Sequence, residues 1–155
     1  ERWVYYIVEH FKERNRTISC ELAQQLCEIV ENYSSYVQQL AWLLFSLINE
    51  GETATEVLLN RAVNDLLDAN EALFMQQIEP LSAYQLNFLR AISDGHQRGF
   101  GERNVREEYN LGSPSNISRL KSSLIKKDLI ETQAKGTLNI TDPVFKLWIQ
   151  RRISQ

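Results

Sequence analysis

Short polar side chains and one arginine gather in residues 113–122, just after a glycine. Serine hydroxyls can bind phosphate oxygens, and asparagine and arginine can each hydrogen-bond two atoms of one base edge. Nearby lysines would add phosphate contacts. These residue types favour recognition of duplex DNA rather than covalent chemistry. The predicted DNA-binding residues are Ser113, Ser115, Asn116, Ser118, Arg119, Ser122, Lys126 and Lys135.

Residues that could catalyse a reaction or bind a metal are scattered along the chain. His10 and His96 lie in different halves, and Cys20 and Cys27 are seven residues apart on one expected helix. That spacing is roughly 10 Å along a helix axis, too far for a disulfide. The sequence has no G-x-x-x-x-G-K-[ST] or G-x-G-x-x-G phosphate loop. We therefore expect no catalytic residue, no metal site and two buried free thiols.

The polar residues of 113–122 require a helix with a buried opposite face. Ile117, Leu120 and Leu124 have the spacing of such a face. Pro114 suits the first turn of this helix, since its missing N–H has no partner there. The outward face could equally be an ordinary solvated surface, or it could bind a protein.

The surrounding pattern predicts the rest of this unit. Ser82 precedes a helix with Tyr84, Phe88, Leu89 and Ile92 as apolar positions, and a shorter helix follows over about 102–109. Two β-prone runs, 129–132 and 137–140, flank a turn, and Asp142-Pro143 opens a last helix. Helix, helix, turn, helix and hairpin is the order of a winged helix-turn-helix.

The first half of the chain is predicted to be helical throughout. Trp3, Ile7 and Phe11 share one helical face, and Ser19 is expected to cap a second helix. Thr53 with Glu56 has the pattern of a capping box, and residues 70–78 form a short separate segment. The fold class is therefore mainly α, with a helical bundle over 1–80 and a winged helix over 81–155.

The net charge of −3 over 155 residues hides a strong asymmetry. Residues 1–81 carry five basic against thirteen acidic side chains, and residues 82–155 carry twelve against seven. The sign change near Pro80 favours two functional units. Two cysteines favour a reducing compartment, and no stretch predicts a membrane span. Because the chain begins at Glu1 without Met, we expect it to be a piece of a longer protein.

Four stretches carry a family resemblance. They are Ser34–Leu40, Leu81–Gln85, Gly112–Ile117 with Leu120 and Leu124, and Asp142–Trp148, which reads Asp-Pro-Val-Phe-Lys-Leu-Trp. In this order they resemble the C-terminal part of a prokaryotic P-loop ATPase family, the archaeal-type ATPases of the AAA+/STAND group. Asn32, Tyr33 and Ser34 stand where that family usually has Gly, His and Pro.

The resemblance implies a helical lid over 1–80 that packs on an upstream nucleotide-binding domain of the same chain. ATP and Mg²⁺ would belong to that parent protein, and this fragment would be non-catalytic and cytoplasmic. The lid segment expected to face nucleotide is Tyr33, Ser34, Ser35 and Tyr36.

Two alternatives to DNA binding follow from the same residues. The winged helix could be a docking or autoinhibitory module anchored by Phe145 and Trp148, in which case the face around Ser115, Arg119 and Ser122 would be buried. The chain could also be an independent transcription factor that dimerises through residues 1–80.

Overall fold

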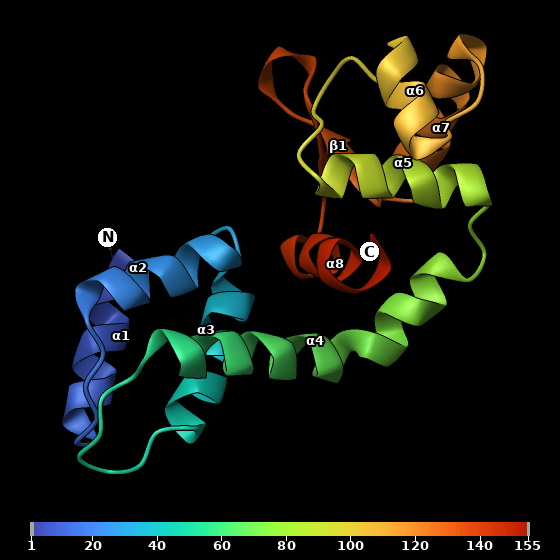
Figure 1. The fold of residues 1–155 in the computed structure, drawn as a ribbon. Coiled ribbons are helices and arrows are strands. Elements are labelled where there is room, and N and C mark those ends of the chain that lie inside the picture. The colour runs from blue at the N-terminus through green and yellow to red at the C-terminus, as the bar shows by residue number, and fades with distance from the viewer. Residues whose placement is uncertain (1, 155) are drawn as a thin grey trace. The chain divides into compact units, whose positions relative to one another are not determined.

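The chain is mainly α-helical, as predicted, with one small antiparallel sheet. A computed structural model describes residues 2–154, which divide into two compact units, one ending at Glu71 and one beginning at Ala72 (Figure 1). The division falls within helix α4 (Glu56–Ile78), upstream of the predicted boundary at Pro80. The physical reason is Phe74, whose ring packs against Phe145 and Trp148 of the second unit.

The first unit is built from helices α1 (Arg2–Glu13), α2 (Cys20–Ile29) and α3 (Ser34–Ser46) and the beginning of α4. Helices α1, α2 and α3 pack pairwise. The predicted apolar faces supply the core, and the predicted cap is confirmed because Ser19 Oγ accepts the Leu22 N–H at 3.0 Å. Core residues of this unit include Ile7, Phe11, Leu22, Leu26, Val37, Leu40, Leu44, Leu59 and Leu66.

Three local predictions in the first unit and at the division between the units are wrong. Thr55, not Thr53, caps α4, since its Oγ1 accepts the Leu58 N–H at 3.2 Å, while Thr53 forms a β-bridge with Thr17. Residues 70–78 continue α4 instead of forming a separate segment. Cys20 is exposed, because it lies at the first position of α2, whereas Cys27 is buried as predicted and burial raises the pKa of its thiol.

The second unit contains α5 (Ala83–Ser93), α6 (Arg103–Tyr109), α7 (Pro114–Lys126), strands β1 (Ile130–Thr132) and β2 (Leu138–Ile140), and α8 (Pro143–Trp148). The strands pair with Ile130 opposite Ile140 and are joined by the 3₁₀ turn η1 (Ala134–Gly136). The Leu138 N–H also donates to Gln97 O at 3.0 Å, which ties the hairpin to the α5–α6 loop. A π-helical turn η2 (Ile149–Ile153) follows α8.

Helix α5 is the centre of this unit and contacts α6, α7, β2, α8 and η2. In Figure 1, α6 and α7 lie on one side of α5 and α8 on the other. Ser82 precedes α5 and Asp142 opens α8, as the sequence predicts. The structure adds that Ser82 forms a reciprocal capping box with Gln85 and that Asp142 accepts the N–H groups of Val144 and Phe145. Phe88, Leu89 and Ile92 are buried, but Tyr84 is 44% exposed, so its assignment to the core is wrong.

None of the helices among residues 2–154 combines the length and the hydropathy that crossing a bilayer requires.

Candidate nucleic-acid interface

Helix α7 has a buried apolar face and an exposed polar face, as its periodicity predicts. Leu120 and Leu124 are buried against the core of the second unit, where α7 contacts α5 and β1. Ser118, Arg119 and Ser122 are exposed on the opposite side. The helix therefore presents a polar face with one arginine, and nothing in the described part of the unit covers it.

Within residues 2–154, the first turn of α7 leaves one backbone donor open, the Ser115 N–H. Ser113 is the N-cap residue but makes no side-chain capping bond, because its Oγ lies 3.0 Å from Ser115 Oγ instead. Both serines are exposed, and Pro114 contributes no N–H. The Asn116 N–H donates to Ser113 O at 3.0 Å, which leaves the Ser115 N–H as the donor of this turn that a phosphate oxygen could accept, assisted by the helix dipole.

Asn116 has a structural contact that the sequence did not reveal. It is half-buried, and its Nδ2 donates to Leu111 O at 3.0 Å across the turn between α6 and α7. This bond uses one of the two Nδ2 hydrogens of Asn116, which leaves the other hydrogen and Oδ1 for a further contact. Its Nδ2 would also lie only 3.1 Å from a Cβ at Gly112, whose φ of +83° favours glycine.

Arg106 holds the same turn from the other side. Its Nε donates to Gly101 O at 2.9 Å and its Nη1 donates to Gly112 O at 3.1 Å. Both nitrogens are thereby used inside the fold, so this cation shapes the helix-turn-helix and is not a free phosphate ligand.

The wing carries a second basic group. Lys135 lies in the turn between β1 and β2 with a φ of +66°, and its side chain is exposed. Arg98 reaches this turn from the α5–α6 loop, where its Nη2 donates to Lys135 O at 3.2 Å. Sequence reasoning missed Arg98; the available signal was a basic residue in the glycine-containing loop 94–101.

The charges of α7 and the wing are uncompensated locally. Within residues 2–154, Arg119, Lys126, Lys127 and Lys135 make no ion pair with a carboxylate. By contrast, Arg103 on α6 pairs with Glu107 at 2.8 Å. The four cations on α7 and the wing are therefore available to an external anion.

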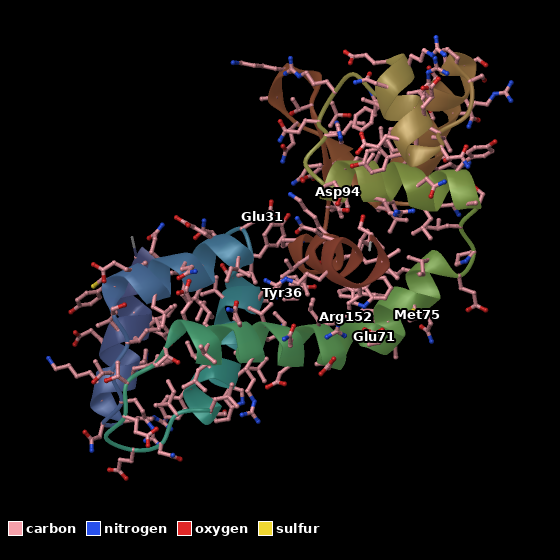
Figure 2. All side chains as sticks on the ribbon, viewed as in Figure 1. Glu31, Tyr36, Glu71, Met75, Asp94 and Arg152 are labelled. Atoms are coloured by element: carbon pink, nitrogen blue, oxygen red, sulfur yellow. The ribbon has the colours of Figure 1, made fainter. Side chains whose placement is uncertain are left out.

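A polar cluster at the end of α5 fixes the chain there. Asp94, labelled in Figure 2, accepts the Tyr109 hydroxyl at 2.9 Å and the Ser154 hydroxyl at 3.2 Å. Burial, reinforced by the bond to the Asp94 carboxylate, raises the pKa of Tyr109 to about 12. These hydrogen bonds join α5, α6 and residue 154, and we interpret the cluster as structural rather than catalytic.

The predicted lid segment lies at the start of α3. Tyr33, Ser34 and Ser35 are exposed, and Tyr36 is half-buried in the first turn of the helix. Asn32 before them has a φ of +59°, a conformation that glycine and asparagine tolerate best. The contact of this segment with nucleotide stays a prediction.

No three His, Cys, Asp or Glu side chains among residues 2–154 gather closely enough to hold a metal ion.

The hairpin beside three helices, with α7 as the outward helix, defines a winged helix. The chain belongs to the family described as "Probable winged helix domain", whose model matches residues 72–151. This match confirms the predicted winged helix.

A structural likeness extends over both units. The fold is similar to that of the Walker-type ATPase of Pyrococcus abyssi, with a TM-score of 0.69 and 19% sequence identity over 96% of this chain. The chain spans 41% of that protein's length. At this identity the likeness concerns the fold alone. No curated protein matches the chain at a significant level.

Proposed function

We propose that the second unit binds duplex DNA, with α7 in the major groove and the wing against a neighbouring phosphate. One observation carries this proposal: the cations of α7 and the wing are exposed and have no carboxylate partner within residues 2–154. A cation that is buried or paired with a carboxylate contributes less to phosphate binding, because it must first give up that environment. An exposed, unpaired cation can neutralise a phosphate directly and so release a counterion from the DNA.

Each predicted residue has a place in this mode of binding. Ser113 and Ser115 surround the open first turn of α7, which would hold a phosphate. Ser118, Arg119 and Ser122 would face base edges, with Arg119 as the reader of guanine. Lys126, Lys135 and the newly found Arg98 would contact the backbone. Asn116 would hold the turn through Leu111 O and offer its second amide hydrogen to the DNA.

We propose further that the chain is a non-catalytic part of an ATP-binding protein. The fold likeness to a Walker-type ATPase and the ordered motifs support this. ATP and Mg²⁺ would be held by a nucleotide-binding domain elsewhere in the full-length protein, and residues 1–71 would form its lid, with Tyr33–Tyr36 toward the nucleotide. The free cysteines and the archaeal neighbour favour a prokaryotic, cytoplasmic protein.

The docking alternative has less support. It expects Phe145 and Trp148 to anchor a partner, but both side chains are at most 1% exposed inside the second unit. It also expects a covered α7 face, whereas Ser115, Arg119 and Ser122 are exposed in this chain.

Fluorescence anisotropy of a labelled random duplex tests the DNA-binding proposal. We expect micromolar binding at low salt that weakens steeply as salt rises. Lys126→Ala should weaken binding and reduce the salt slope by about 1, because one phosphate contact is lost, whereas Arg119→Ala should weaken binding by loss of a base contact. Arg61→Ala, which removes the same charge from an exposed position of the first unit, is the matched control and should change neither. Affinity no better than millimolar at low salt would sink the proposal.

A further inference from the structure

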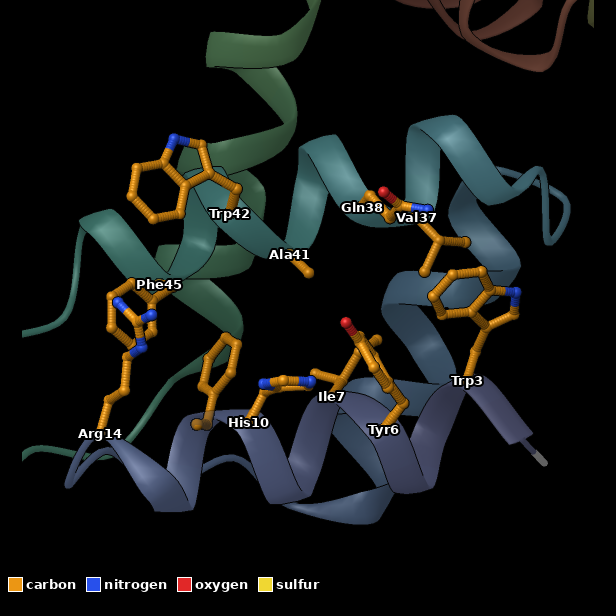
Figure 3. Close-up of a pocket in the computed structure, with 11 residues that line it drawn as sticks. Trp3, Tyr6, Ile7, His10, Arg14, Val37, Gln38, Ala41, Trp42 and Phe45 are labelled. Atoms are coloured by element: carbon orange, nitrogen blue, oxygen red, sulfur yellow. The ribbon is translucent and has the colours of Figure 1, made fainter.

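A groove of about 250 Å³ runs between α1 and α3 of the first unit (Figure 3). Trp3 of α1 lies opposite Val37 at one end, and Arg14 lies near Phe45 at the other. Ala41 occupies the middle, across from Tyr6 and His10. Its small side chain fails to fill the space between the helices, and this is what leaves the groove open.

The walls of the groove expose aromatic surface. Trp42 is 63% exposed and Tyr6 is 50% exposed, although both have large apolar rings. Tyr6 contacts Trp3 at 5.6 Å and His10 at 4.1 Å between ring centroids, and Trp42 stacks on Phe45. Contiguous exposed apolar surface of this kind marks an interaction site.

The shape favours side chains of a protein over a small molecule. A small-molecule site surrounds most of its ligand and is generally larger than this groove. Here the aromatic walls stay half-open to solvent, and the groove has room for one or two large side chains. An amphipathic helix docking its apolar face between two helices needs such a surface.

The charge at one end indicates which partner fits. The first unit is strongly acidic overall, yet four of its five basic residues lie on or just after α1: Arg2, Lys12, Arg14 and Arg16. The guanidinium groups of Arg14 and Arg16 lie 5.9 and 4.6 Å from the centroid of the Phe45 ring. Neither arginine pairs with a carboxylate within residues 2–154, and Glu13 is paired with His10 instead. Arg16 does not line the groove, because its Nη1 donates to Arg14 O at 2.6 Å and its Nε donates to Ile48 O at 3.4 Å. Arg14 does line the groove, so this end of it carries one exposed cation without a carboxylate partner among the described residues.

We propose that the α1–α3 groove binds an amphipathic helical segment of a partner protein, with apolar anchors between Trp42 and Tyr6 and an acidic residue beside Arg14. The apolar anchors supply affinity, and Arg14 sets the orientation and disfavours basic segments. This site belongs to the first unit and does not depend on DNA binding by the second.

A set of synthetic peptides tests the proposal on the whole 155-residue chain. The probe is a helical peptide of about 15 residues with leucines at i, i+4 and i+7 and glutamates at one end. One twin carries lysines in place of the glutamates, and another carries alanines in place of the leucines. Trp3 and Trp42 line the groove while Trp148 is buried elsewhere, so tryptophan fluorescence reports binding.

We expect the acidic peptide to bind in the micromolar range and both twins to bind about tenfold more weakly. Arg14→Glu should invert the preference between the acidic and basic peptides, and Arg61→Glu in the same unit, which makes the same change of charge, should not. Trp42→Ala and the groove-filling Ala41→Leu should each abolish binding. Tyr5→Ala is the control, because Tyr5 is 71% exposed on α1 but does not line the groove.

Three results would overturn the proposal. Equal binding of the acidic and basic peptides would show that Arg14 does not select the partner's charge. An equal loss from Tyr5→Ala and Trp42→Ala would show that the groove is not the site. Sedimentation that reveals a dimer abolished by Trp42→Ala would assign the groove to a second copy of the chain. Circular dichroism spectra would establish that each variant is folded.

Discussion

Each unit contains a tryptophan stacked on a phenylalanine three residues away, but the two tryptophans differ in their exposure to solvent. In α3 the rings of Trp42 and Phe45 lie 6.0 Å apart with an interplanar angle of 18°. In α8 the rings of Phe145 and Trp148 also lie 6.0 Å apart, at 16°. Trp148 is fully buried, whereas Trp42 is 63% exposed. The local helix geometry produces the same ring pair twice, but it does not decide burial.

What decides burial is the third ring. Phe74 from α4 covers the second pair, at 5.2 Å from Phe145 and 5.6 Å from Trp148. The first pair receives Phe11 on Phe45 alone, at 5.5 Å, and Arg16 over the same ring. One pair therefore stabilises its own unit, and the other retains its apolar surface for a partner.

The largest expected effect is on the free energy of unfolding, and it differs between alanine variants of the two tryptophans. Trp148→Ala should destabilise the second unit by about 3–5 kcal/mol, since it leaves a cavity among Phe74 and Phe145. Trp42→Ala should cost less than about 1 kcal/mol, because an exposed ring loses little burial. Amide hydrogen exchange, followed separately for each unit, measures both. A Trp42→Ala loss as large as that of Trp148→Ala would contradict the comparison.

Helix caps test whether the units are stabilised independently. Ser82→Ala should destabilise the second unit by about 1 kcal/mol, because the Gln85 N–H loses its acceptor, and leave the first unit unchanged. Ser19→Ala should do the reverse through the Leu22 N–H. The same exchange measurement reports both variants. Equal loss of protection in both units from either variant would mean that they unfold together.

The smallest expected effect is a dependence on alkaline pH in the second unit. The pKa of Tyr109 is raised from 10.0 to about 12, so the folded state favours the protonated hydroxyl. This contribution is complete below pH 10 and is lost as pH rises from there through about 12. Tyr109→Phe should abolish this part of the pH dependence of unfolding. Absorbance of tyrosinate in the wild type should show one late-titrating group that the variant lacks.

Much of the fold could be predicted because its signals are local. The faces of α1 and α7, the caps Ser19, Ser82 and Asp142, and the hairpin depend on residues within a few positions of each other. The errors occurred where local signals compete. Thr53 and Thr55 both precede the start of α4, and only the pairing of Thr53 with Thr17 leaves Thr55 as the cap.

The candidate site was predictable in position but not in its details. Periodicity placed Ser118, Arg119 and Ser122 outward on α7. It could not show that Asn116 donates to Leu111 O, or that Arg98 reaches Lys135 O across 37 residues of sequence. Those bonds depend on how the turn and the wing pack, and the spacing of residues along the sequence does not predict that packing.

The sequence by itself determined the winged-helix order, the helical first half and the division of charge, because periodicity, caps and charge patterning act over short distances in the chain. Only the tertiary structure decided which aromatic pair is covered, which cations are paired and where the units divide. Those outcomes depend on contacts between distant residues, such as Phe74 with Trp148, and on the absence of a large side chain at Ala41.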